Sequence, residues 1–103
     1  MKINEFLKEK ILENLKKRLN KLVAIPAPEI IIEALKKEIK NIEAGKEIKI
    51  SGDTKYLTHN FISDEIKIGQ GGKKYTQFIL ENGEKVNYFP NAKYGRYIKK
   101  EKK

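Results

Sequence analysis

Residues 73–89 read KKYTQFILENGEKVNYF, two apolar-rich runs on either side of Asn82-Gly83. Asn-Gly between such runs is a strong signal for a β-hairpin, because a type I′ turn needs positive φ at both central residues. A two-residue loop of this kind would pair Ile79 with Val86. This register assigns every hairpin side chain to one face of the sheet or the other. The face with Ile79 would carry Tyr75, Gln77, Ile79, Val86 and Tyr88.

Alternation of apolar and polar residues extends the predicted sheet beyond the hairpin. Ser51-Gly52-Asp53 is expected to be a turn, and Pro90-Asn91 is expected to end the strand before it. The charged residues 99–103 are predicted to form a frayed basic tail. The predicted strands are 47–50, 62–68, 73–80, 84–89 and 94–99.

The first half of the chain has helical periodicity. Apolar residues recur at spacings of three and four from Ile3 to Val23, and again from Ile31 to Ile42. Pro26 and Pro28 separate the two helices, and Gly45 is the expected end of the second. The predicted core is Phe6, Ile11, Leu15, Leu19, Leu22, Ile31, Leu35, Ile39, Ile48, Ile50, Ile66, Ile68, Ile79 and Val86.

These patterns predict a single α+β domain over residues 1–103. A helical hairpin (1–45) is expected to pack on one face of a small antiparallel sheet of three to five strands (46–98), followed by the basic tail (99–103). The sheet is short relative to the first helix, whose apolar stripe would stay partly uncovered. We therefore also expect a homodimer through the first helix.

Composition excludes several classes of function. The chain has 103 residues with 23 Lys plus Arg against 14 Asp plus Glu, a net charge of +9 that favours anionic partners. With no Cys and one His, it has no disulfide scaffold, no thiol nucleophile and no His-cluster metal site. No apolar run approaches the ~18 residues that span a bilayer, and the charged first ten residues do not resemble a signal peptide. We expect a cytoplasmic protein with no metal, no cofactor and no membrane partner.

Aromatic and basic residues interleave towards the C-terminus, and Gly69–Gly72 precedes two lysines. Unpaired bases stack on aromatic rings while neighbouring cations hold the phosphates, and Gly-rich loops can turn backbone N–H groups towards a phosphate. In a purely structural alternative, Tyr94 and Tyr97 anchor an edge strand that lysines keep soluble. The predicted residues for binding nucleic acid or a partner are Lys73, Lys74, Lys93, Tyr94, Arg96, Tyr97, Lys99 and Lys100.

Two enzymatic alternatives rank last. Asp53 with Glu65-Ile66-Lys67 resembles the Asp…Glu-x-Lys core of restriction-type nucleases, where two carboxylates hold Mg²⁺. Because 21 of the 103 residues are lysine, such a match is expected by chance. Helices followed by a sheet, small size and positive charge are also similar to small ribonuclease toxins, but those usually begin with a strand. We expect no catalytic residues and no enzyme.

The sequence therefore favours a small basic non-enzymatic protein that binds nucleic acid or a nucleoprotein. The alternative is a phage- or plasmid-type inhibitor, in the style of anti-defence and anti-CRISPR proteins. Such an inhibitor would block a host nucleic-acid-processing protein, with surface aromatics as binding hot spots. The two hypotheses differ in whether the partner is lost on nuclease treatment.

Overall fold

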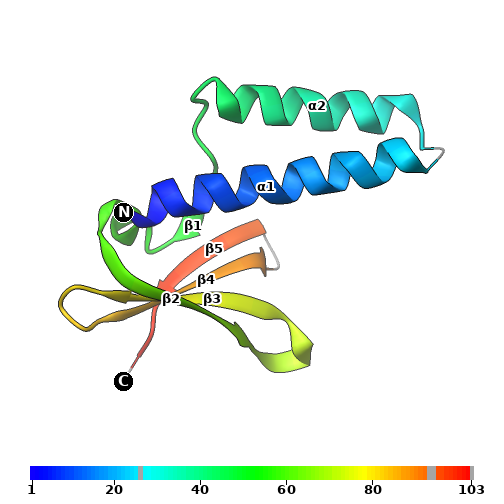
Figure 1. The fold of residues 1–103 in the computed structure, drawn as a ribbon. Helices are drawn as coiled ribbons and strands as arrows, with labels where there is room; N and C mark the ends of the chain where they lie inside the picture. The colour runs from blue at the N-terminus through cyan, green and yellow to red at the C-terminus, as the bar shows by residue number, and fades with distance from the viewer. Residues whose placement is uncertain (26, 93–94, 103) are drawn as a thin grey trace. The chain divides into compact units, whose positions relative to one another are not determined.

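The computed structural model describes residues 1–25, 27–92 and 95–102. It contains two helices and a five-stranded sheet, which confirms the α+β class (Figure 1). The chain divides into two compact units, a helical unit of residues 6–48 and a sheet unit of residues 1–5 with 49–103. Packing of the helices on the sheet and formation of a single domain stay predictions.

The helices closely match the periodicity of the sequence. Helix α1 spans Ile3–Ala24 and α2 spans Glu29–Glu43. The Nζ of Lys16 lies 3.3 Å from Oε2 of Glu43, an ion pair between the helices. Ile31 was predicted in the core, but it lies in the first turn of α2 beside the interhelical link and is exposed. The buried residues of this unit are Leu7, Ile11, Leu15, Leu35, Ile39 and Ile42.

The sheet has the strand order β1-β5-β4-β3-β2. Pairing is antiparallel between β2 and β3, between β3 and β4, and between β4 and β5. Strand β1 pairs in parallel with β5, so the sheet is mixed. The start of the chain joins it through a bridge between Lys2 and Asn60. Its elements are β1 (Ser51–Gly52), a 3₁₀ turn η1 (Thr54–Thr58), β2 (Phe61–Ile68), a second turn η2 (Gln70–Gly72), β3 (Lys74–Leu80), β4 (Lys85–Ala92) and β5 (Gly95–Lys100).

Three predicted strand boundaries were wrong. Residues 47–50 form no strand. The strand that pairs with β5 is instead β1, whose residues Ser51 and Gly52 were predicted to form a turn. Strand β4 continues through Pro90, because the register shifts between Phe89 and Ala92 and a bulge tolerates the missing N–H of proline. The predicted basic tail overlaps β5, and the N–H of Glu101 still donates to the carbonyl of Lys85 at 2.9 Å.

The hairpin register was also predicted wrongly. The loop has three residues, since the N–H of Leu80 donates to the carbonyl of Glu84 at 2.8 Å. Of the described loop residues, Gly83 alone has positive φ (87°), so the turn is not type I′. Asn82 instead accepts the Glu84 N–H on its side-chain oxygen at 3.0 Å. Phe78 rather than Ile79 therefore pairs with Val86.

This one-residue difference moves the side chains of β4 to the opposite face relative to those of β3. We call the buried side the core face, which consists of Phe78, Leu80, Val86, Tyr88 and Ile98. The opposite side is the aromatic face, which consists of Tyr75, Gln77, Asn87, Phe89, Tyr97 and Lys99. Ile66 and Ile68, predicted in the core, are exposed because β2 is an edge strand. Ile79 is half-buried on the side of the aromatic face.

Candidate nucleic-acid interface

Three aromatic rings form a ladder across the aromatic face. The register places Phe89 on β4 opposite Tyr97 on β5, and Tyr75 on β3 lies on the other side of Phe89. The ring centroids of Tyr75 and Phe89 are 5.2 Å apart, and those of Phe89 and Tyr97 are 6.3 Å apart. Each side chain is half-buried, so part of each ring reaches the surface. The ladder is thus an accessible aromatic surface that crosses three strands.

A glycine lies against each end of the ladder. A Cβ atom on Gly52 would lie 2.8 Å from Cε2 of Tyr97, closer than real Cβ atoms approach other atoms. A Cβ on Gly69 would lie 3.4 Å from Cε1 of Tyr75. The missing side chains therefore leave room for the two terminal rings.

A polar row runs beside the ladder. Gln77 is only 3% exposed, and its side-chain nitrogen donates to Oδ1 of Asn87 at 3.0 Å and to Oε1 of Glu101 at 3.1 Å. Lys99 pairs with Asn87 in the register and therefore lies on the same face. Because both N–H groups of Gln77 have acceptors, this row holds its side chains in defined positions. Lys99 therefore brings a positive charge next to the aromatic ladder.

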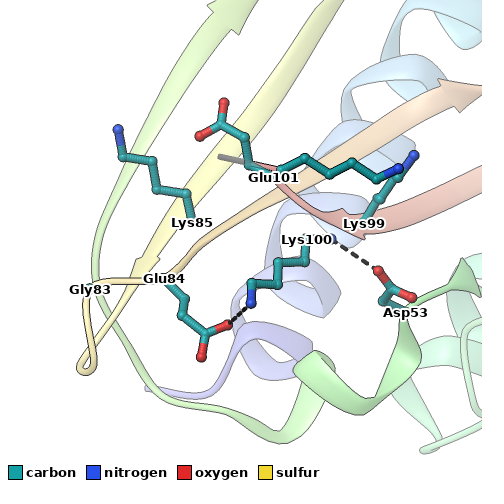
Figure 2. Close-up of a pocket in the computed structure, with 8 residues that line it drawn as sticks. Asp53, Gly83, Glu84, Lys85, Lys99, Lys100 and Glu101 are labelled. Atoms are coloured by element: carbon teal, nitrogen blue, oxygen red, sulfur yellow. Dashed lines mark hydrogen bonds and ion pairs between the residues drawn. The ribbon is translucent and has the colours of Figure 1, made fainter.

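A charged depression of about 800 Å³ adjoins this row at the end of β5 (Figure 2). Within it, Nζ of Lys100 lies 2.9 Å from Oε2 of Glu84, and the backbone N–H of Lys100 donates to Oδ2 of Asp53 at 3.1 Å. The hydrogen bond from Lys100 lowers the pKa of Glu84 below its ordinary value and raises the pKa of Lys100. Lys100 is therefore held at two points, its ammonium by Glu84 and its backbone N–H by Asp53.

Other cations of the depression are available to a ligand. Within the described part of the chain, Lys85, Lys99 and Lys102 line the depression and make no ion pair. Its carboxylates are already engaged, since Glu101 accepts a hydrogen bond from Gln77. An anion entering here would meet ammonium groups that have no carboxylate partner, and Lys99 connects this charge to the aromatic face.

The structure separates the predicted site residues into groups. Tyr97 and Lys99 lie on the aromatic face, whereas strand alternation places Arg96 and Lys100 on the opposite side of β5. Arg96 lies near the hydroxyl of Tyr88, where burial raises the pKa of Tyr88 and the guanidinium opposes that rise. Arg96 therefore does not lie on the same face of β5 as Tyr97, although both are among the predicted binding residues.

The remaining predicted residues lie elsewhere or outside the described chain. Lys73 follows the η2 loop, and its carbonyl accepts the Gly69 N–H at 2.8 Å; Lys74 begins β3. Lys93 and Tyr94 lie outside the described residues.

Sequence reasoning missed the ladder partners of Tyr97. A two-residue hairpin loop predicts Tyr75 and Phe89 on opposite faces, whereas the observed three-residue loop places them on the same face. The sequence signal for this register is Gly83, which can be the last residue of a three-residue hairpin loop. Such a loop needs positive φ at that one residue only.

The nuclease-like residues do not form an evident catalytic cluster. In residues 1–25, 27–92 and 95–102, no group of three or more His, Cys, Asp and Glu side chains could hold a metal ion. Asp53 instead accepts the Lys100 N–H. His59 is exposed, its ring packs 5.3 Å from that of Tyr56, and its carbonyl accepts the N–H of Ile3.

Neither described helix is long and apolar enough to cross a membrane. No family model, curated protein or solved structure matches the chain. The geometry and chemistry of the sheet unit therefore carry the functional argument.

Proposed function

We propose that the protein is a non-enzymatic module that binds single-stranded nucleic acid on its aromatic face. The observation that carries the proposal is the ladder formed by Tyr75, Phe89 and Tyr97. Aromatic rings on a sheet surface stack with unpaired bases, each stack contributing about 1–3 kcal/mol. Bases within a duplex are already stacked on one another, so a ring ladder favours a single strand.

The cations beside the ladder suit the phosphates of the same strand. Lys99 lies in the row next to Tyr97, and Lys85 and Lys102 line the adjoining depression. At the other end, Lys67 pairs with Tyr75 in the register. If three of these lysines contact phosphates, log K should fall with log salt with a slope of about −2, since each contact releases counterions.

The test is fluorescence anisotropy with a labelled oligonucleotide of twelve uridines or thymidines at low salt. Phe89→Leu and Tyr97→Leu keep apolar bulk but remove the stacking surface, so each should weaken binding about tenfold. Lys99→Gln should weaken binding and reduce the salt slope, whereas Lys46→Gln, an exposed lysine of the helical unit, should do neither. Circular dichroism verifies that each variant is folded.

The proposal fails if the wild-type chain does not bind either oligonucleotide, or if both ring variants bind as tightly as wild type. If Lys46→Gln reduced the affinity as much as Lys99→Gln does, the oligonucleotide would be attracted by net charge alone.

The aromatic face also suits the second hypothesis, an inhibitor that covers the nucleic-acid site of a host protein. Tyrosine rings such as Tyr97 are common hot spots of protein interfaces, where removal of one costs about 2 kcal/mol or more. A pull-down from a host lysate with and without nuclease distinguishes the two. One stoichiometric protein retained after nuclease treatment, and lost with Tyr97→Leu, would favour the inhibitor.

A further inference from the structure

Strand β2 leaves a long sheet edge open. It is the last strand in the sheet order, and its start is covered where the Phe61 N–H donates to the carbonyl of Met1 at 3.4 Å. From Ser63 to Ile68, no described segment pairs with its outer edge. Three isoleucines of this strand are exposed, Ile62 by 67%, Ile66 by 69% and Ile68 by 70%. A long apolar edge of this kind is a template for another strand.

The charges along β2 make this edge complementary to itself. In an antiparallel pair, residues opposite one another share a face of the sheet. Two copies of β2 centred on Ile66 would therefore place Ile66 against its own copy. The same register would place Glu65 of each copy opposite Lys67 of the other, giving two ion pairs.

The two neighbouring symmetric registers oppose like charges. Centring the pair on Glu65 brings two glutamates face to face, and centring it on Lys67 does the same with two lysines. Neither side chain makes an ion pair with another described residue of its own chain, so both are available. Lysine on an edge strand ordinarily discourages pairing, but in this register each Lys67 is matched by a glutamate.

We propose that the protein forms a homodimer by antiparallel pairing of its β2 edges, centred on Ile66. The two sheets then continue into one another around a twofold axis perpendicular to the sheet. This symmetry puts the aromatic faces of both copies on the same side of the joined sheet. A single strand pair is smaller than a standard protein interface, so the dimer is weak and dissociates on dilution. The pairing requires no nucleic acid, although it uses Lys67, which also lies on the aromatic face.

The test is sedimentation equilibrium over a range of protein concentrations, without nucleic acid. Glu65→Lys replaces each ion pair by two lysines and should raise the dimer dissociation constant about tenfold, and Lys67→Glu should do the same with two glutamates. The double variant Glu65→Lys/Lys67→Glu restores opposite charges in the same register and should return the constant to within about threefold of wild type. Glu47→Lys, at an exposed site outside the sheet, controls for the change in net charge.

A wild-type chain that stays monomeric at the highest concentration overturns the proposal. So does a dimer that is insensitive to both single variants, which would direct attention to the first helix instead. Failure of the double variant to recover association, with circular dichroism unchanged, would refute the register centred on Ile66.

Discussion

Replacing Gly52 by alanine should release β1 from the sheet. Gly52 has a φ of +95°, and a Cβ atom there would overlap the carbonyl oxygen of Ile98 and lie 2.8 Å from Cε2 of Tyr97. That carbonyl is backbone of β5, which also pairs with β4, and it already accepts the Asp53 N–H at 2.8 Å. It has little freedom to move, so the two-residue strand must shift.

The loss of stability follows from two contributions. Positive φ costs alanine about 1–2 kcal/mol wherever it occurs. Displacing β1 also weakens the hydrogen bonds of Asp53 to Ile98 and to Lys100, each of which contributes about 0.5–1.5 kcal/mol. We expect Gly52→Ala to lower the free energy of unfolding by about 3 kcal/mol, a large part of the stability of a small domain.

Gly45 provides a matched control, because it has the same φ of +95° at the end of α2 but no atom within 4 Å of the added Cβ. Gly45→Ala should lose only the backbone contribution of about 1–2 kcal/mol. The assay is urea unfolding followed by circular dichroism. Equal losses in the two variants would refute the close approach of β1 to β5. Because Tyr97 contacts the same position, Gly52→Ala should also weaken oligonucleotide binding.

Other outcomes test the core, the ion pair and the absence of catalysis. Phe78→Ala should cost about 3–5 kcal/mol because Phe78 is fully buried, whereas Ile66→Ala at an exposed site should cost under ~1 kcal/mol; similar urea midpoints would contradict the register. The hydrogen bond from Lys100 lowers the pKa of Glu84 below its ordinary 4.5, so this carboxylate stabilises the fold above that pH and the contribution is lost as pH falls through the lowered pKa. The difference in stability between wild type and Glu84→Gln should therefore be largest near neutral pH and vanish in acid; a difference that does not change with pH would be the contrary result. Incubation with Mg²⁺ or Mn²⁺ should leave DNA and RNA intact, and turnover abolished by Glu65→Ala would establish a nuclease instead.

Local sequence patterns were sufficient to predict most of the helices and strands. Apolar spacing of three and four predicted a helix from Ile3 to Val23, within one residue of the observed end of α1 at Ala24, because helical periodicity needs no distant contact to be recognised. The proline-containing link and Gly45 predicted the bounds of α2 to within two residues. Alternation likewise predicted most of β2, β3 and β4, and the α+β class followed from this order of elements.

The candidate site could be predicted only in part. Tyr97 and Lys99 were selected because aromatic and basic residues interleave near them, which is a property of composition. Their neighbours Tyr75 and Phe89 come from other strands, and their proximity depends on cross-strand register. Arg96 was selected on the same ground as Tyr97, but alternation along β5 sends adjacent side chains to opposite faces.

The sequence by itself determined the two helices and most of the extended segments, because those preferences are local. Tertiary structure alone decided which side chains meet. The Asn82-Gly83 pair is compatible with loops of two or three residues, and hydrogen bonding of Asn82 to Glu84 accompanies the longer one. Side chains alternate with a period of two, so that single extra loop residue moves Phe78 into the core and brings Phe89 beside Tyr75.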